Sequence, residues 1–511
     1  MFKDKIIFIL TILILLLGLF LIGCSKESTV NDEVSSSAIN EDKITVKTND
    51  LKGTNFENLA IPENYDLRQF QGITLNFIVE NNINANILSH ESEAFSKLTG
   101  INVKIRAMDY DTLVQKVNLD FLSQAGEYQI IYVDPYQTLN RFYDHLEVLN
   151  PYNENPDIPH LKGFPDDFFR NQTEVISYFK ENSDWYAVPF DSTTMILYYR
   201  KDIFDKYRDN FIQEMGYDWT PGKKDFTWER YIEVARWIDN NVPDEEVKYG
   251  SGHMAQQHNS VYCEFSNILA AYGGDYFSDK NINTLGRDSF NNINILDENF
   301  LKALDIYKEV VKASAPESVN WNWTGVVNAF RNGEIAMMPN WDENSTYIEN
   351  EQSRVKGKVA YSILPYGDVR SANIYGGAGI GINKYTSDLK KQAAWLYITW
   401  ATSRDMQLKI LKHPEGGSMP TRKSAYNDPV IKEYLLKSRL DTENNISYKH
   451  MNAVLNAWKS ENIYLRPKIK NFFQVEQILI RNLHEMVKND IDSSEIREKI
   501  YTELNNIRDS E

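Results

Sequence analysis

The sequence predicts an α/β protein with two lobes, and three observations lead to this prediction. The chain has 511 residues, which is too long for one hydrophobic core and long enough for two large ones. From Gly72 to Val133, stretches with the periodicity of strands alternate with stretches with the periodicity of helices. Further on, a glycine-rich strand, Asn373–Asn383, precedes a helical pattern that reaches Ala401.

The N-terminus has the features of an export signal. Lys3 and Lys5 form a short positive region, an apolar run covers Ile6–Phe20, and Leu21–Cys24 places small residues before a cysteine. This end resembles a bacterial lipobox, so we expect residues 1–23 to be a lipoprotein signal peptide and Cys24 to receive the lipid. The alternative is an uncleaved transmembrane anchor, since the apolar run is borderline in length for crossing a bilayer.

The composition of the chain limits the kinds of partner that the protein is expected to bind. The formal net charge is -17 and no basic run occurs, which argues against nucleic acid and against an anionic membrane bound through a broad basic face. Only two cysteines are present, so lipidation of Cys24 leaves Cys263 without a disulfide partner; we expect it to be buried as a small hydrophobe. Residues 24–60 are rich in Ser, Glu, Asp, Asn and Thr and predict a disordered tether.

The alternation after the tether predicts a parallel sheet with connecting helices. The expected strands and helices are Ile73–Val79, Ile87–Thr99 (ending at Gly100), Ile101–Arg106, Tyr110–Ser123 and Gln129–Val133. In such sheets ligands gather at the carboxyl ends of the strands. The candidate binding residues there are Glu80, Asn81, Asn82, Asp134, Tyr136 and Gln137.

Further expected elements have clear boundary signals. Thr227 predicts the start of a helix as its N-cap, with Trp228 in a structural role. A strand is expected to end at Tyr249–His253, a helix to cover Ser260–Tyr272, and a strand at Ile335–Met338 to lead to Trp341.

Several motifs, taken in order, resemble the extracellular solute-binding proteins of ABC importers, in the cluster that binds sugars and oligosaccharides. The resemblance spans about Gly72 to Ile507. One departure occurs at Tyr128-Gln129, where family members usually carry Pro-Asp, and it affects only the expected turn into the next strand. The matching segments are Phe95–Val103, Trp185–Pro189 followed by Leu197–Phe204, Phe330–Met337, Asn373–Asn383 with its helix, and Ser418–Arg422.

The resemblance implies a two-lobed fold of the periplasmic-binding-protein type, with a hinge and a ligand cleft between the lobes. It implies that lobe 1 holds residues 61–188 and 367–412, and lobe 2 residues 189–366 and 413–511. It adds Asp191, Gln256 and Asn259 as candidate cleft residues. For Asp191, a turn or cap role is the alternative.

Carbohydrate offers hydroxyls for carboxylates and amides, and apolar faces for aromatic rings. Trp341 stands beside Asn340 and Asp342 after a strand, which favours a role in stacking on a sugar. Any single aromatic residue is alternatively part of the core. The candidates of this kind are Trp321, Trp323, Trp341, Asp342, Tyr375, Gly376 and Gly377.

We therefore expect a monomeric, lipid-anchored, extracytoplasmic protein that delivers a sugar or oligosaccharide to ABC transporter permease subunits, without cofactor or metal. The alternative is the same fold binding a peptide, polyol or phosphorylated solute; Arg370 and Arg422 are the candidates for an anionic ligand. A surface carbohydrate-active enzyme is disfavoured, because no nucleophile-elbow, phosphate-loop or zinc-protease motif is present. Asp342 and Glu343 are adjacent, and adjacent strand residues point to opposite faces.

Overall fold

The computed structural model describes residues 56, 59–179, 184–278, 292–440 and 449–509, which belong to one compact unit, Thr45–Glu511. The predicted signal peptide, Cys24 and most of the predicted tether lie outside the described residues. Among the helices that are described, none is both long and apolar enough to cross a membrane.

The strands form two main sheets. One has five strands in the order β2-β1-β3-β9-β4, the other has three in the order β6-β5-β7, and β8 and β10 form a separate pair. Their bounds are β1 (Thr74–Glu80), β2 (Asn102–Met108), β3 (Ile130–Val133), β4 (Ala187–Asp191), β5 (Met195–Arg200), β6 (Met337–Trp341), β7 (Val359–Ser362), β8 (Asn373–Ile374), β9 (Ala378–Ile382) and β10 (Ile463–Tyr464).

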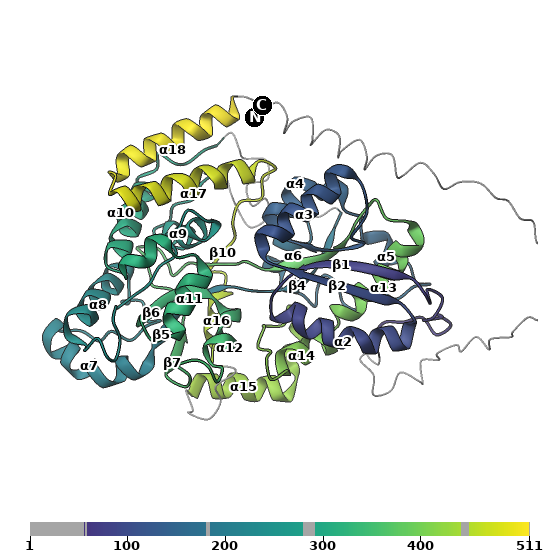
Figure 1. Cartoon of the computed structure of the whole chain (residues 1–511), viewed down its shortest axis with the longest axis horizontal. Helices are drawn as coiled ribbons and strands as arrows, with labels where there is room; N and C mark the ends of the chain where they lie inside the picture. Colours follow the sequence, from purple (N-terminus) through teal and green to yellow (C-terminus); the bar gives the residue numbers. More distant parts are fainter. Residues whose placement is uncertain (1–55, 57–58, 180–183, 279–291, 441–448, 510–511) are drawn as a thin grey trace, which may run out of the picture. The chain divides into compact units, whose positions relative to one another are not determined.

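Helices surround both sheets (Figure 1). Their bounds are α2 (Ile83–Thr99), α3 (Tyr110–Ser123), α4 (Asn140–Phe142), α5 (Asn150–Glu154), α6 (Arg170–Ile176), α7 (Lys201–Met215), α8 (Trp228–Asn241), α9 (Asn259–Ala271), α10 (Glu298–Lys312), α11 (Trp323–Arg331), α12 (Ser345–Ile348), α13 (Asp388–Ala401), α14 (Arg404–Lys412), α15 (Pro429–Leu440), α16 (Met451–Ala457), α17 (Phe472–Asn489) and α18 (Ser493–Arg508). Short helical turns are η3 (Pro135–Leu139), η4 (Tyr143–His145), η5 (Pro316–Asn320), η6 (Asp342–Asn344) and η7 (Lys423–Asn427).

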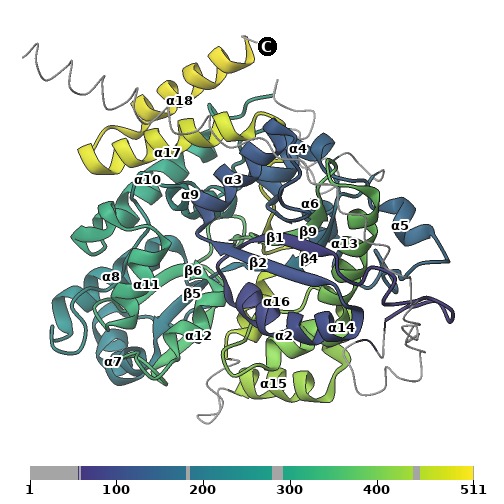
Figure 2. The ribbon, with the colours of Figure 1, turned by 45° about the vertical axis from the view of Figure 1, so that its right-hand side comes forward.

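The five-stranded sheet begins as predicted and then changes direction. β1 pairs in parallel with β2 and β3, whereas β9 pairs antiparallel with β3 and β4. Helices α3 and α13 contact β1, and α2 contacts β2 (Figure 2). Leu75, Phe77, Ile78 and Val79 of β1 are therefore all buried, which is the burial expected of a central strand covered on both faces.

Several helix boundaries follow from local chemistry. Helix α2 starts at Ile83, earlier than predicted, because the Asn82 side chain accepts a hydrogen bond from the Ala85 amide. It ends as predicted at Gly100, whose φ of 73° is the left-handed conformation that closes helices. Thr227 caps α8 as expected, through the Arg230 amide.

Two strand predictions were wrong. Tyr249–His253 forms no strand; Tyr249 makes only an isolated bridge to Ile335. The predicted strand Asn373–Asn383 is two strands, β8 and β9, interrupted at Tyr375–Gly377. Gly377 there has a φ of 57°, which is incompatible with a continuous strand.

The three-stranded sheet has its own helices. α11 contacts β6, α7 contacts β7, and α16 contacts β5 and β7, while α17 and α18 pack together beside α9 and α10. The protein is thus a mixed α/β structure of the two-lobed kind. The predicted lobe boundaries remain a prediction. The boundary predicted between residues 188 and 189 falls inside β4, which is a strand of the five-stranded sheet.

Two chain segments join the sheets and contact each other. Ser192–Thr194 leads from β4 to β5, and Tyr375–Gly377 leads from β8 into β9. Thr194 forms an antiparallel bridge with Tyr375, and the Gly376 amide donates to the Thr193 carbonyl oxygen at 2.9 Å. These paired segments are named the crossing segments below.

Candidate ligand-binding site

A pocket of about 210 Å³ is lined by residues from both sheets and from the crossing segments. The five-stranded side contributes the end of β1, β3 and the start of α3. The other side contributes α9, α11, β6 and η6, and Arg466 follows β10. The lining residues are Glu80, Asn81, Tyr110, Tyr132, Asp134, Thr193, Asn259, Cys263, Trp323, Thr324, Trp341, Glu343, Asn344, Gly376, Gly377 and Arg466.

The polar residues of the five-stranded side come together because of strand register. β1 and β3 are parallel, with Phe77 opposite Ile130 and Ile78 opposite Ile131. Continuing that register places Glu80, the last residue of β1, opposite Val133, and Asn81 opposite Asp134. The carboxyl ends of the two strands therefore open into the same pocket, as the sequence predicted.

The opposite wall is aromatic. Trp341, the last residue of β6, has 9% of its surface exposed and borders the pocket. Trp323 starts α11, and its ring contacts that of Tyr110 edge-on, with centroids 6.1 Å apart. Since Tyr110 begins a helix that packs on β1, this ring pair joins residues from both sides of the pocket.

Glycine is required where the crossing segment meets the pocket. A Cβ on Gly376 would lie 2.7 Å from Thr193 Cγ2 and 3.1 Å from Trp341 Cζ3. The glycine therefore lets the crossing segment pass close beneath the Trp341 ring. A side chain here would push into the aromatic wall or separate the crossing segments.

Carboxyl groups dominate the electrostatics of the pocket. Burial, together with nearby Asp191 and Asp134, raises the pKa of Glu80 to about 8, although a hydrogen bond from Tyr132 opposes the shift. Burial and the neighbouring Asp191, Glu80 and Asp342 raise the pKa of Glu343 well above its usual value. A carboxyl with a raised pKa keeps its proton to higher pH, and in that form it can both donate and accept hydrogen bonds.

Arg466 lies at the other end of the pocket. Its guanidinium is 3.8 Å from the centroid of the Tyr136 ring, and Nη1 donates to Cys263 Sγ at 3.6 Å. Burial raises the pKa of the Glu476 carboxyl to about 8, with Arg466 opposing that shift. Arg466 therefore interacts with the carboxyl groups of Asp134 and Glu476 at this end of the pocket.

A second cavity of about 300 Å³ adjoins the first, and Tyr110 and Asn259 line both. It also borders Gln137 and Glu476. Gln137 Nε2 donates to Glu476 Oε2, and Asn259 Nδ2 donates to Glu476 Oε1 at 2.8 Å. The two cavities together offer room for more than a single small ring.

The structure brings many of the predicted residues to these cavities. Those that line the first pocket are Glu80, Asn81, Asp134, Asn259, Trp323, Trp341, Gly376 and Gly377. Gln137 lines the second. Asp134 also has a structural task, because its Oδ1 accepts hydrogen bonds from the Tyr136 and Gln137 amides.

Three predicted polar residues form bonds beside the pocket instead of lining it. Asn82 caps α2 and donates to Asp191 Oδ2 at 3.1 Å. Asp191 also accepts from the Tyr132 hydroxyl at 2.8 Å and from the Thr193 amide at 3.2 Å. Asp342 Oδ1 accepts from the Thr194 amide at 2.6 Å, and burial raises the pKa of this carboxyl to about 7.

Other predicted residues are part of the packing around the site. Tyr136 and Tyr375 are buried below 2% exposure. Trp321 packs against Gly325 and its carbonyl oxygen accepts from the Gln256 amide at 3.1 Å. None of these four residues appears among the described residues that line the two cavities.

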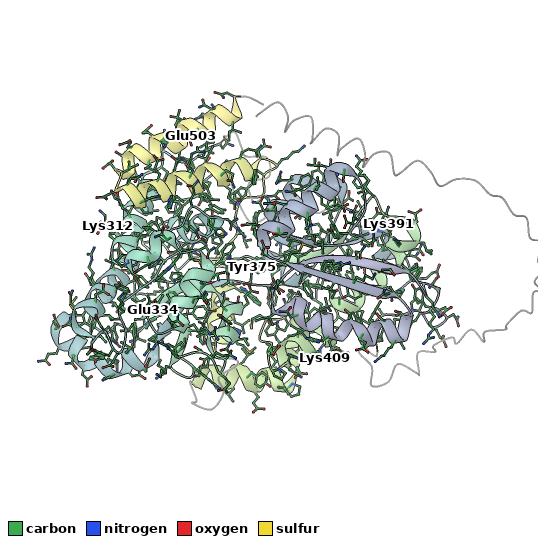
Figure 3. All side chains as sticks on the ribbon, in the orientation of Figure 1. Lys312, Glu334, Tyr375, Lys391, Lys409 and Glu503 are labelled. Carbon is green, nitrogen blue, oxygen red and sulfur yellow. The ribbon has the colours of Figure 1, made fainter. Side chains whose placement is uncertain are left out.

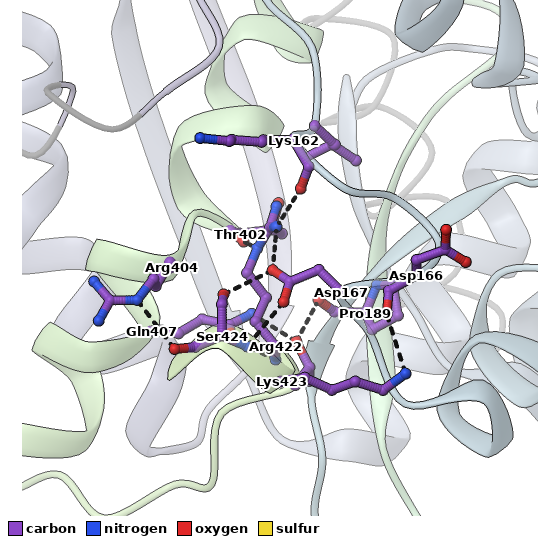
Figure 4. Close-up of polar contacts among 12 residues, drawn as sticks. Lys162, Asp166, Asp167, Pro189, Thr402, Arg404, Gln407, Arg422, Lys423 and Ser424 are labelled. Atoms are coloured by element: carbon purple, nitrogen blue, oxygen red, sulfur yellow. Dashed lines mark hydrogen bonds and ion pairs between the residues drawn. The ribbon is translucent and has the colours of Figure 1, made fainter. Parts of the chain in front are cut away.

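Arg422 lies in a different place. It borders a separate cavity with His160 and Asp167, and its Nη1 contacts Asp167 Oδ2 at 3.0 Å (Figure 4). Nε donates to the Thr402 carbonyl oxygen at 2.7 Å. These contacts hold the segment after α14 against the loop near Asp167 and do not reach the pocket.

Sequence reasoning missed several lining residues. Asp342 was chosen as a candidate, whereas its neighbour Glu343 was not. The strand ends at Trp341 and η6 begins, so Asp342 turns toward Thr194 while Glu343 faces the pocket. The other missed residues are Tyr110, Tyr132, Cys263, Thr324, Asn344 and Arg466.

Within the described part of the chain, no group of three or more His, Cys, Asp and Glu residues could hold a metal ion. The site is thus a pocket with hydrogen-bonding groups and aromatic rings between two α/β lobes. Its geometry is that of a two-lobed binding protein.

Comparison with known proteins defines the family. Residues 85–408 match the family model for bacterial extracellular solute-binding proteins, and the chain belongs to this family. It is therefore a substrate-binding protein of the ABC transporter class and is extracytoplasmic. The family and fold are those of substrate-binding proteins.

Solved structures and a curated relative agree with this membership. The fold is similar to maltose-bound MalE3 of T. maritima, with a TM-score of 0.69, 24% identity, and coverage of 85% of this chain and 100% of that one. It is similar to a solute-binding protein of Agrobacterium radiobacter K84 in complex with ribitol, with a TM-score of 0.68, 21% identity, and coverage of 86% and 99%. A "Probable amino-acid ABC transporter periplasmic-binding protein" of Sinorhizobium fredii is 22% identical, over 66% of this chain and 70% of that protein.

Proposed function

We propose that the protein binds a sugar or oligosaccharide in the pocket beside Trp341 and delivers it to an ABC transporter permease. The observation that carries the proposal is the composition of the pocket, where aromatic rings stand opposite carboxyl and amide groups. Rings cover the apolar faces of sugars, and the polar groups bond to their hydroxyls. The maltose and ribitol complexes of proteins with this fold support the same ligand chemistry.

The two neighbouring cavities favour a ligand of two or more rings. Tyr110 and Asn259 border both cavities, so a saccharide filling one would extend past them into the other. Gln137 and Glu476 would then meet the second ring. A monosaccharide would leave this second cavity to water.

Ligand binding is proposed to bring the lobes together. The pocket takes residues from both sheets, so a ligand contacting both sides binds the closed arrangement more tightly than an open one. The crossing segments are the proposed hinge. Gly376 and Gly377 supply backbone freedom there.

The proposal also includes the anchor. The apolar run that ends in Leu-Ile-Gly-Cys supports cleavage before Cys24 and lipid attachment at its sulfur. Mass spectrometry of the membrane-extracted protein decides this. We expect an N-terminal peptide that starts at a lipid-modified Cys24, and an intact peptide from Met1 through Cys24 would contradict the proposal.

A thermal-shift screen of the detergent-solubilised full chain tests the ligand class. The arms are mono- and oligosaccharides, ribitol, an amino-acid mixture, short peptides and a sugar phosphate. A ligand present at about a hundred times its dissociation constant adds about 2.7 kcal/mol of stability. We expect saccharides to raise the unfolding midpoint most. Stabilisation only by peptides, amino acids or a phosphorylated solute would replace the sugar in the proposal and keep the binding-protein role.

A further inference from the structure

The pocket has an excess of acidic groups. Three of its lining residues, Glu80, Asp134 and Glu343, carry carboxyls, and Arg466 is the one basic residue among the described residues that line it. Asp191 and Asp342 lie just behind the wall, bonded to Thr193 and Thr194. A neutral sugar brings no charge that would offset this excess.

Arg466 does not neutralise the two glutamates. Its charge interacts with Asp134 and Glu476, at the end of the pocket near Tyr136. The charged groups that act on Glu80 and Glu343 are other carboxyls. Grouped by element, the titratable groups that interact with the two glutamates are Tyr110 of α3, Tyr132 of β3, Asp134 before η3, Asp191 of β4, Tyr198 of β5 and Asp342 of η6.

Buried carboxylates without a counterion are costly, and a protein usually relieves that cost by protonation. Glu80 and Glu343 are partly buried in the pocket wall, and desolvation and the neighbouring carboxyls raise the pKa of both. An ammonium group placed between the two side chains would supply the missing counterion. The rings of Trp341 and Tyr132 border the same space, and aromatic rings also attract cations.

A second observation, on Arg466, indicates what chemical group the ligand carries besides the ammonium. Arg466 has 5% of its surface exposed, and its Nε–H has no hydrogen-bond partner within the residues that the structure describes. This donor needs an acceptor oxygen, which a saccharide hydroxyl or ring oxygen supplies. A purely aliphatic polyamine has no such oxygen.

We infer that the solute is an amino sugar, recognised through an ammonium group between Glu80 and Glu343 and through an oxygen near Arg466. This inference rests on the proposed function and specifies its ligand. It predicts a preference for saccharides with a free amine over the same saccharides with that amine acylated.

The test is calorimetric titration of the full chain in detergent at pH 7. The probes are glucosamine and its β-1,4-linked disaccharide, the N-acetylated form of each, maltose, and spermidine. N-acetylation keeps the ring and removes the charge. We expect the free amines to bind about tenfold to a hundredfold more tightly than their acetylated forms, which is the range for a hydrogen bond to a charged group.

Two variants test whether the preference for the free amine depends on Glu343. Glu343→Gln keeps the side-chain volume and should reduce the preference for the free amine by about tenfold or more. Glu334→Gln is the matched control, since Glu334 is an exposed glutamate just before β6 (Figure 3) and is not one of the described pocket residues. It should leave both affinities unchanged. The unfolding midpoint of each variant confirms that it is folded.

Proton exchange gives an independent readout. An ammonium entering the pocket should expel protons from Glu80 and Glu343, so titrations of the wild type in buffers of different ionisation enthalpy should reveal net proton release. The acetylated sugars should show none. In Glu343→Gln the release should shrink.

The outcomes separate the inference from the proposed function. Equal binding of free and acetylated sugars, or tighter binding of maltose than of either, would overturn the ammonium site and leave the sugar-binding proposal standing. If only spermidine binds, the ammonium site would stand, and the claim that the ligand is a saccharide would be overturned. Heat from none of the probes would overturn both. An unchanged preference in Glu343→Gln would overturn the placement between the two glutamates.

Discussion

Replacing Trp341 with alanine separates the two roles that the structure gives this ring. Trp341 borders the ligand pocket, and it is also 91% buried against the core, since 9% of its surface is exposed. Truncating a buried Trp usually costs about 3–5 kcal/mol of stability. The cost here should be at the lower end, about 3 kcal/mol, because one side of the ring borders a cavity.

The affinity should fall as well. Removing a central aromatic residue from a binding surface commonly costs about 2 kcal/mol or more, which is about thirtyfold in the dissociation constant. Trp341→Phe keeps a ring and should lose less of both quantities. Trp228→Phe is the matched control, because Trp228 is buried in α8 and is not one of the described pocket residues. It should lower stability without changing affinity.

Calorimetric titration with the best saccharide gives the dissociation constants, and urea unfolding of each ligand-free variant gives the stabilities. If Trp341→Ala is shown to be folded and its affinity lies within threefold of the wild type, the stacking role of Trp341 would be refuted. Equal losses of affinity in Trp341→Phe and Trp228→Phe would assign the effect to the core.

Three further outcomes are expected. In the folded protein the pKa values of Glu80 and Glu476 are raised to about 8 and that of Asp342 to about 7, so these groups hold protons that the unfolded chain releases at lower pH. The free energy of unfolding should therefore fall as pH rises from about 5 to about 8, by at most about 1.4 kcal/mol per pH unit and group. A melting temperature that stays constant or rises over this range would contradict the burial of these groups. Gly376→Val should weaken saccharide binding about tenfold or more, because the valine side chain would meet Thr193 and Trp341. Gly357→Val controls for general effects of losing a glycine, since no atom lies within 4 Å of the Cβ added there, and it should leave the affinity unchanged in the same titration. Arg422→Met should lower the free energy of unfolding by about 3 kcal/mol, because Asp167 loses its buried partner, and should leave affinity unchanged; a selective loss of affinity would return Arg422 to the site.

The sequence predicted the regular parts of the fold well because local signals define them. The helix Tyr110–Ser123 has the predicted bounds, and its N-cap Asp109 accepts from the Thr112 amide. Gly100 ends α2 where expected. The antiparallel pairing of β9 was not predictable, because it depends on where the chain returns from the second sheet.

The site was most predictable where a residue ends a strand or follows it directly. Glu80, Asp134 and Trp341 satisfy that rule and line the pocket. Arg466 and Tyr110 reach it through tertiary packing, for which single-sequence patterns carry no signal. The predicted strand Ile335–Met338 is β6, Met337–Trp341, and η6 begins at Asp342, so Asp342 and Glu343 lie in a helical turn whose direction the sequence pattern did not predict.

The central claim is that a saccharide binds between the two lobes and draws them together about the crossing segments. Small-angle scattering of the detergent-solubilised full chain tests this most directly, measured with and without a saccharide whose saturation is established by calorimetry. The account predicts a smaller radius of gyration with ligand for the wild type, and a smaller decrease for Gly376→Val at the same ligand concentration. An unchanged radius of gyration in the saturated wild-type protein would contradict it.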